Sequence, residues 1–153
     1  MELIVTSDVF ENNGIIPIKY TGHGEDISPP LHLSALHTDI KSLAIIMDDI
    51  KHPLFRVYNH WVIWNLPIMT DIPEGIPHGA VIKEFDNATQ GLGYGRHKYR
   101  GPKPPLGTRH EYRYTVYVLD SLLELKENSK KADLLKIMES HVLQQGEIVG
   151  KYK

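Results

Sequence analysis

The sequence predicts a mainly β domain with a helix near its C-terminal end. Short segments with the alternating or continuous apolar pattern of strands run through the first 119 residues. Clusters of glycine and proline separate these segments. Helical periodicity begins only after Leu122. With 153 residues, of which 41% are hydrophobic and 24% charged, the chain is long enough to bury a core of its own. We therefore expect one domain over residues 1–153.

The expected strands are residues 2–10, 15–20, 31–33, 42–49, 60–66, 81–85 and 112–119. Segment 42–49 is a continuous apolar run up to its two final carboxylates, which is typical of a strand buried on both faces. Segment 60–66 alternates, so His60, Val62 and Trp64 are predicted to share one face of the sheet, together with Leu66. Segment 112–119 has the clearest strand pattern in the chain.

Three segments are predicted to be irregular, residues 21–30, 67–79 and 87–108. The last carries five glycines and three prolines, and loops of this length in a compact domain are usually functional. A helix is expected over residues 130–142, capped by Asn128 or Ser129. Its apolar side would contain Ala132, Leu135, Met138 and Val142.

Residues 47–67 are the segment around which a site is expected. The apolar strand stops at Asp48 and Asp49, the chain turns through Pro53, and a new strand begins at His60. If the two strands are antiparallel neighbours, the end of one and the start of the other share an edge of the sheet. A carboxylate and an imidazole then meet there, which predicts a polar pocket at the rim of the β-core.

The chain has nine histidines, and His60 and His110 differ from the others because each begins a strand-like segment. Spacing alone leaves three interpretations open. Both histidines can be structural, with Asp48 and Asp49 a solvated strand end. Asp49, His60 and His110 also suit a two-histidine, one-carboxylate metal site. Alternatively, they line a ligand pocket. The P-loop, GxSxG and HExxH patterns are absent, so the common hydrolase and nucleotide-binding signatures are missing.

The composition of the chain indicates which classes of partner and which compartment to expect. A net charge of −2 gives the chain no overall basic field, so we do not expect it to wrap nucleic acid. The absence of cysteine agrees with a reducing cytoplasm, where we expect the protein to reside. No N-terminal signal pattern and no apolar run of about 20 residues is present, so no membrane span is expected.

Four motifs in order resemble the phosphatidylethanolamine-binding protein family, of the small bacterial and archaeal type called Raf kinase inhibitor-like. They are GEDISPPL at 24–31, DIKHP at 49–53 in place of DPDxP, HWVIWNLP at 60–67, and YRGPKPP at 99–105 followed by Gly107 and His110-x-Tyr112. Together they span nearly the whole chain. The tail, residues 139–152, is also similar to the terminal helix of the family.

The resemblance implies a large antiparallel sheet packed on a smaller one, with a C-terminal helix and a small rim pocket for anions. Carried over by position, the pocket residues are Asp49, His60, Gly101, His110 and Tyr112, with Pro53, Pro102 and Pro105 shaping its walls. Imidazole, tyrosine hydroxyl and free backbone amides in a turn are the donors that an anion needs. Asp49 would accept from one imidazole and fix its tautomer.

The function implied is binding of a small anion or a phosphorylated head group, such as phosphate, acetate or phosphoethanolamine, with no catalysis, cofactor or metal. The alternative is an interaction protein that inhibits a kinase or protease through its loops. A second copy of the chain is a further partner left open.

Three departures from the family pattern bear on the pocket loops. The first proline of DPDxP is lost and its second acid is Lys51, the arginine after the motif histidine is Glu111, and one residue is gained between Gly107 and His110. The two charge changes have opposite signs. They predict that Lys51 and Glu111 form an ion pair at the rim of the pocket.

Overall fold

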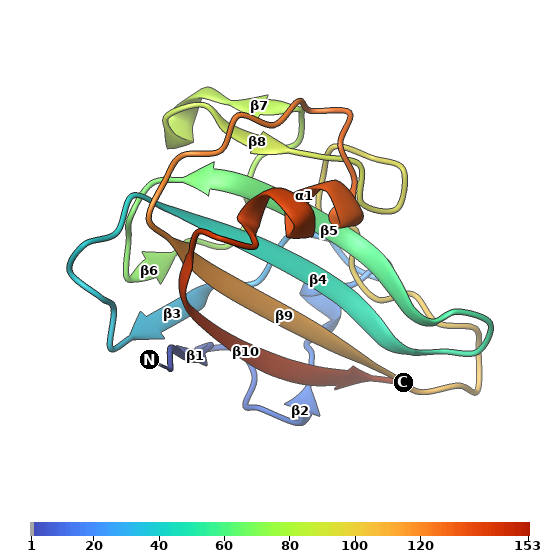
Figure 1. Cartoon of the computed structure of the whole chain (residues 1–153). Helices are drawn as coiled ribbons and strands as arrows, with labels where there is room; N and C mark the ends of the chain where they lie inside the picture. The colour runs from blue at the N-terminus through green and yellow to red at the C-terminus, as the bar shows by residue number, and fades with distance from the viewer. Residues whose placement is uncertain (1) are drawn as a thin grey trace.

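A computed structural model describes residues 2–153, which form two β-sheets and one α-helix (Figure 1). The smaller sheet has the order β1-β3-β6, with β1 at Ile4–Thr6, β3 at Leu31–Ser34 and β6 at Asp71–Ile72. The larger sheet has the order β2-β10-β9-β4-β5-β8-β7. Its strands are β2 (Gly14–Ile15), β4 (Ser42–His52), β5 (Arg56–Leu66), β7 (Val81–Ile82), β8 (Ala88–Gln90), β9 (His110–Leu119) and β10 (Val142–Tyr152). All its pairings are antiparallel except that of β2 with β10. The predicted fold class is confirmed.

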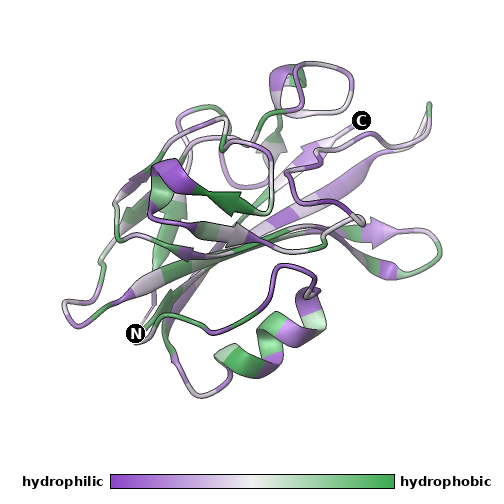
Figure 2. Cartoon of the chain, turned by 90° about the horizontal axis from the view of Figure 1, so that it is seen from above, coloured by the Kyte–Doolittle hydropathy of each residue, from purple (hydrophilic) through white to green (hydrophobic). Residues whose placement is uncertain are grey.

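The large sheet is covered on both faces, which explains the apolar sequence of β4. Leu43, Ile45 and Met47 belong to the main core between the two sheets, while Ala44 and Ile46 belong to a second cluster under helix α1 (Lys131–Met138). Figure 2 shows α1 against one side of the large sheet. The prediction of a strand buried on both faces is confirmed, since alternate residues of β4 enter different cores.

A β-bulge changes the face on which His60 lies. Along β4 the pairing moves by one residue from Met47 to Asp48, but along β5 it moves by two, from Trp61 to Asn59. His60 is the extra residue, and it lies beside the β9 side chains of the main core instead of with Val62 under the helix. The predicted alternation through His60 is therefore wrong. Bulges commonly redirect a side chain in this way next to a site.

A second irregularity affects the other end of β5. Asn65 has a φ of 57° and its side-chain amide is hydrogen-bonded to the backbone of Leu123, with distances of 2.9 and 2.8 Å. Leu66 consequently packs in the main core, not beside Trp64 as predicted.

Several expected boundaries are also corrected. The first strand is only Ile4–Thr6, and residues 15–20 divide into the end of β2 and a short 3-10 helix, Ile18–Tyr20, which follows Pro17. A similar 3-10 turn, Lys83–Phe85, shortens the strand expected at 81–85. Strands β6 and β8 lie inside segments predicted to be irregular. Strands this short carry too few residues to show a period.

The C-terminal region differs most from prediction. Residues 142–152 are not helical but form β10, which pairs with β9 along its whole length. Helix α1 is correspondingly short, and its buried residues are Leu134 and Met138, whereas Leu135 is 40% exposed. Neither Asn128 nor Ser129 caps it; Lys130 is the N-cap, and Asp133 Oδ2 accepts its backbone N–H at 2.9 Å.

Candidate functional site

A cavity of about 260 Å³ lies where β4 ends and where β5 and β9 begin. In Figure 1 the turn between β4 and β5, the loop before β9 and the C-terminus are at this same end of the molecule. The cavity is lined by Asp49, His52, His60, Tyr94, Arg100, Gly101, Lys103, Pro104, Pro105, His110 and Tyr112. Of the residues expected there, Pro53 and Pro102 are not among the lining residues; Pro104 lines the wall next to Pro105.

Asp49 and His110 form a buried pair in the cavity wall. Asp49 Oδ2 accepts from His110 Nδ1 at 2.6 Å, and Asp49 Oδ1 accepts the backbone N–H of Lys51 at 2.9 Å. The two side chains are only 4% and 9% exposed. Both carboxylate oxygens are therefore occupied, and the proton on Nδ1 leaves Nε2 of His110 as the nitrogen available to a ligand.

His60 is oriented by the backbone of the Gly/Pro-rich loop. Its Nδ1–H donates to the carbonyl oxygen of Arg100 at 2.8 Å, so Nε2 is again the remaining nitrogen. Among residues 2–153 neither Nε2 has a hydrogen-bond partner, and neither is sealed from solvent. Burial lowers the pKa of His60 below its ordinary value, although the Arg100 carbonyl and the charge of Asp49 oppose this shift.

The ring of Tyr112 lies near the rings of both His60 and His110. Its ring lies 5.5 Å from that of His60 and 6.3 Å from that of His110, measured between centroids. Burial, followed by the negative charge of Asp49, raises the pKa of Tyr112 far above its usual value. Its hydroxyl therefore stays protonated and can donate a hydrogen bond. The ring of Tyr94 packs edge-on against His60 at 4.9 Å and closes another side.

Gly101 is in the cavity wall, but its amide is not free. The N–H of Gly101 donates to Asp26 Oδ1 at 2.7 Å, so this amide is not available to a ligand. A Cβ at Gly101 would collide with the carbonyl oxygen of Tyr20 and with Asp26. The glycine is needed because two loops approach closely here, and the neighbouring bond from Gly22 N–H to the Pro102 carbonyl, 2.8 Å, joins the same loops.

Two basic side chains in the cavity were not predicted. Arg100 lies over the ring of Tyr94 at 4.4 Å from its centroid, and Lys103 is exposed at the opening. Both flank Gly101 and Pro102 in the motif at 99–105, which is the sequence signal that points to them. His52, the last residue of β4, also lines the cavity and was not among the predicted residues. Since Asp49 is the one carboxylate among the lining residues and is already paired, the cavity favours negative charge.

Two further expectations can be compared with the structure. Within residues 2–153 no group of three histidine, aspartate or glutamate side chains is arranged to hold a metal ion. Lys51 and Glu111 are not among the ion pairs of the described chain, so that prediction is wrong. Glu111 alternates with His110 and Tyr112 along β9 and stands opposite Lys151 of β10. Its side chain therefore points away from the cavity.

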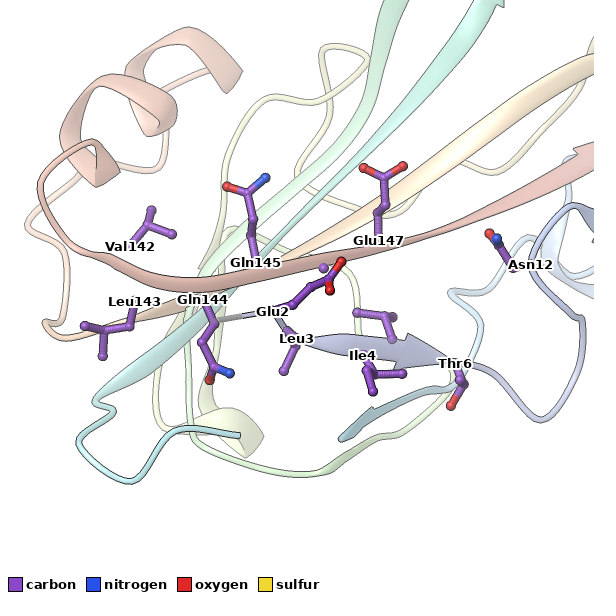
Figure 3. A pocket seen from close by; sticks show the side chains of 12 residues that line it. Glu2, Leu3, Ile4, Thr6, Asn12, Val142, Leu143, Gln144, Gln145 and Glu147 are labelled. Carbon is purple, nitrogen blue, oxygen red and sulfur yellow. The ribbon is translucent and has the colours of Figure 1, made fainter. Parts of the chain in front are cut away.

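Another hollow, of about 870 Å³, lies between β1 and β10 (Figure 3). Its lining includes Glu2, Ile4, Gln145 and Glu147 but no histidine, arginine or lysine. It is an open hollow beside β10, where the carbonyl oxygen of Leu3 packs directly on Gly146. It offers none of the converging donors of the histidine-lined cavity.

Comparison with known proteins agrees with this architecture. Residues 6–153 match the family model described as phosphatidylethanolamine-binding protein. The chain belongs to the phosphatidylethanolamine-binding protein family. A UPF0098 protein of Pyrococcus horikoshii is 46% identical over 149 residues, which cover 96% of this chain and 75% of that protein.

Two solved structures share the family fold. A phosphatidylethanolamine-binding protein homologue from Chlamydia trachomatis superposes with a TM-score of 0.87 at 32% identity, covering 99% of this chain and 97% of that one. Escherichia coli YbcL, described as a member of the mammalian family, gives a TM-score of 0.85 at 24% identity, with 100% and 99% covered, which shows the fold alone. No helix in residues 2–153 is long and apolar enough to cross a membrane.

Proposed function

We propose that this family member binds a small anion or a phosphorylated head group in the histidine-lined cavity and is not an enzyme. One observation carries the proposal: His60 and His110 each have Nδ1 engaged by a protein acceptor, which leaves two Nε2 atoms open in one cavity. When protonated, each Nε2 donates a hydrogen bond to an anion. Phosphate, acetate and phosphoethanolamine are the ligands that fit this chemistry.

Charge and size support the same class of ligand. Arg100 and Lys103 add two positive charges to the lining, and the hydroxyl of Tyr112 adds a neutral donor. A volume of about 260 Å³ is below that of cavities for drug-sized ligands, about 300–1,000 Å³. With so few contacts we expect dissociation constants in about the micromolar to millimolar range.

Calorimetric titration with phosphate, phosphoethanolamine and acetate at two salt concentrations tests the proposal. Binding should be saturable and should weaken with salt, because the attraction is partly between exposed charges. Lys103→Met should weaken phosphate binding by about two- to fivefold. The matched control is Lys83→Met, an exposed lysine outside the cavity, which should change nothing.

Two results would overturn the proposal. One is the absence of saturable anion binding. The other is one metal ion per chain in elemental analysis of the purified protein, lost in His60→Ala, which would favour the metal-site interpretation.

A second candidate function is inhibition of a kinase or protease through the loops. The turn between β4 and β5 favours it, because Leu54 and Phe55 are 81% and 61% exposed there. Exposed apolar side chains gathered on one loop are typical of interaction sites. Capture of one protein partner in the absence of anion, lost in Phe55→Ser, would support this function over the first.

A further inference from the structure

The turn between β4 and β5 is closed by a histidine side chain. His52 is the last residue of β4, and its Nδ1 accepts the backbone N–H groups of Leu54 and Phe55, each at 3.2 Å. Within residues 2–153 neither N–H has another acceptor. An asparagine or aspartate oxygen closes an Asx turn in a similar way, and here an imidazole nitrogen takes its place.

The backbone of this turn depends on that closure. Arg56, the first residue of β5, has a φ of 62°, in the left-handed region that residues other than glycine rarely adopt. Pro53 has no N–H to contribute, and the bond from Val57 N–H to the Phe55 carbonyl, 2.6 Å, leaves the N–H groups at the tip unbound. The His52 ring is therefore what satisfies the N–H groups of the tip.

Only a neutral ring can make these two bonds. An imidazole accepts a hydrogen bond through its unprotonated nitrogen, so His52 carries its proton on Nε2 while the turn is closed. When the ring takes up a second proton, Nδ1 becomes a donor that faces two other donors, and both bonds are lost. Histidine is the side chain whose charge ordinarily changes between about pH 5 and 8. A proton can therefore remove the closure of the turn.

The ring of His52 also belongs to the anion cavity. Its centroid lies 5.0 Å from that of Phe55 and 5.1 Å from that of Tyr58, and Arg56 is its partner in strand register. Asp49 on its own strand is the carboxylate in the cavity, and it is already bonded to His110. The other titratable or charged side chains that line the cavity with His52 are His60, Tyr94, Arg100, Lys103, His110 and Tyr112. An anion among them would supply the negative charge that favours a protonated His52.

We propose that His52 is a pH-sensitive latch of the β4–β5 turn, which projects at one end of the molecule (Figure 1). The neutral ring holds the turn closed, and protonation releases it. Leu54 and Phe55 are mostly exposed on this turn, so the latch controls how these apolar side chains are presented. One consequence rests on the proposed function: an anion bound beside His52 favours the protonated ring and opens the turn at a higher pH.

Solvent-exchange NMR in the absence of anion tests the latch. The protection of the Leu54 and Phe55 amides against exchange, relative to an unfolded peptide of the same sequence, is measured from about pH 8 to about pH 5. The ¹⁵N shifts of His52 follow the titration of the ring in the same samples. We expect both protections to fall by about fivefold, the equivalent of one ordinary hydrogen bond, with the same midpoint as the ring.

Three variants separate the latch from other effects of pH. His52→Asn keeps an acceptor at the position of Nδ1 but takes up no proton, so the protection of Leu54 and Phe55 should not depend on pH. His52→Ala has no acceptor, and both amides should exchange rapidly at every pH. His37→Asn is the matched control, because His37 Nδ1 accepts the backbone N–H of Asp39 at 3.1 Å outside the cavity. This control should leave the pH profile of the turn unchanged.

Two results would overturn the latch. One is protection that stays constant while His52 titrates, and the other is pH-dependent protection that persists in His52→Asn. Repeating the series with saturating phosphate tests the link to the cavity, and the midpoint should then move to higher pH. If bound phosphate leaves the midpoint unchanged, the link is wrong and the proton latch is retained. If phosphate does not bind, the proposed function fails, while the series without anion still decides the latch.

Discussion

Replacing Asp49 by asparagine tests the geometry of the buried pair directly. The side-chain oxygen of the new asparagine can still accept the hydrogen bond from the backbone N–H of Lys51. Its NH₂ group then takes the place of the carboxylate oxygen that lies 2.6 Å from His110 Nδ1. Two donors cannot share that contact. We therefore expect His110 to accept at Nδ1 and to carry its proton on Nε2.

The size of the effect on phosphate binding depends on whether His110 Nε2 carries a proton that it can donate to the anion. In the wild type the Nδ1 proton is held by Asp49, so Nε2 donates to an anion only after His110 takes up a second proton. In Asp49→Asn the neutral ring already donates from Nε2. Proton uptake by His110 on phosphate binding should therefore fall, by up to about one proton per phosphate. The hydrogen bond from His110 Nε2 to the phosphate also changes, from one donated by a charged ring to one donated by a neutral ring. This change weakens phosphate binding by about 1 kcal/mol, or about fivefold.

Calorimetry in buffers of different ionisation enthalpy measures the proton uptake, and ¹⁵N NMR of the imidazole identifies the tautomer. Asp71→Asn is the matched control, because Asp71 is 2.6 Å from His32 in an exposed pair outside the cavity. That variant should leave phosphate binding unchanged. Unaltered proton uptake together with an unaltered His110 tautomer in Asp49→Asn would refute the reasoning.

Two further predictions concern stability. Since burial lowers the pKa of His60 in the folded chain, its contribution to stability is present above about pH 6.5 and is lost as the pH falls, because the unfolded chain takes up the proton first. The free energy of unfolding in urea should therefore decrease less between pH 7.5 and 5.5 in His60→Gln than in the wild type; equal decreases would contradict this. Gly101→Ala should cost about 1–3 kcal/mol and weaken phosphate binding, because the new methyl group collides with Tyr20 and Asp26 and displaces the wall. An unchanged unfolding midpoint would show that the wall can adjust.

Local patterns in the sequence were sufficient for much of the fold. The β class and the doubly buried strand β4 were predicted from runs of apolar residues and turn signals, and the antiparallel pairing of β4 with β5 was the condition on which the site prediction depended. Asp49, His60 and His110 were singled out because the sequence pattern placed each at a strand end, although β4 continues to His52 and β5 already begins at Arg56. A side chain's preference for a strand and its position in the strand depend on near neighbours, which a short window of sequence contains.

The features that depend on contacts between residues far apart in the chain were determined only by the tertiary structure. Residues 142–152 became a strand because β9 offers them a hydrogen-bonding edge, and His60 turned toward the cavity because pairing with β4 leaves one extra residue in β5. Arg100 and Lys103 reached the cavity because their loop is bonded to another loop some 75 residues away in the chain. Strand register, bulges and loop contacts depend on hydrogen bonds between residues that are far apart in the chain. A short window of sequence does not contain both partners of such a bond.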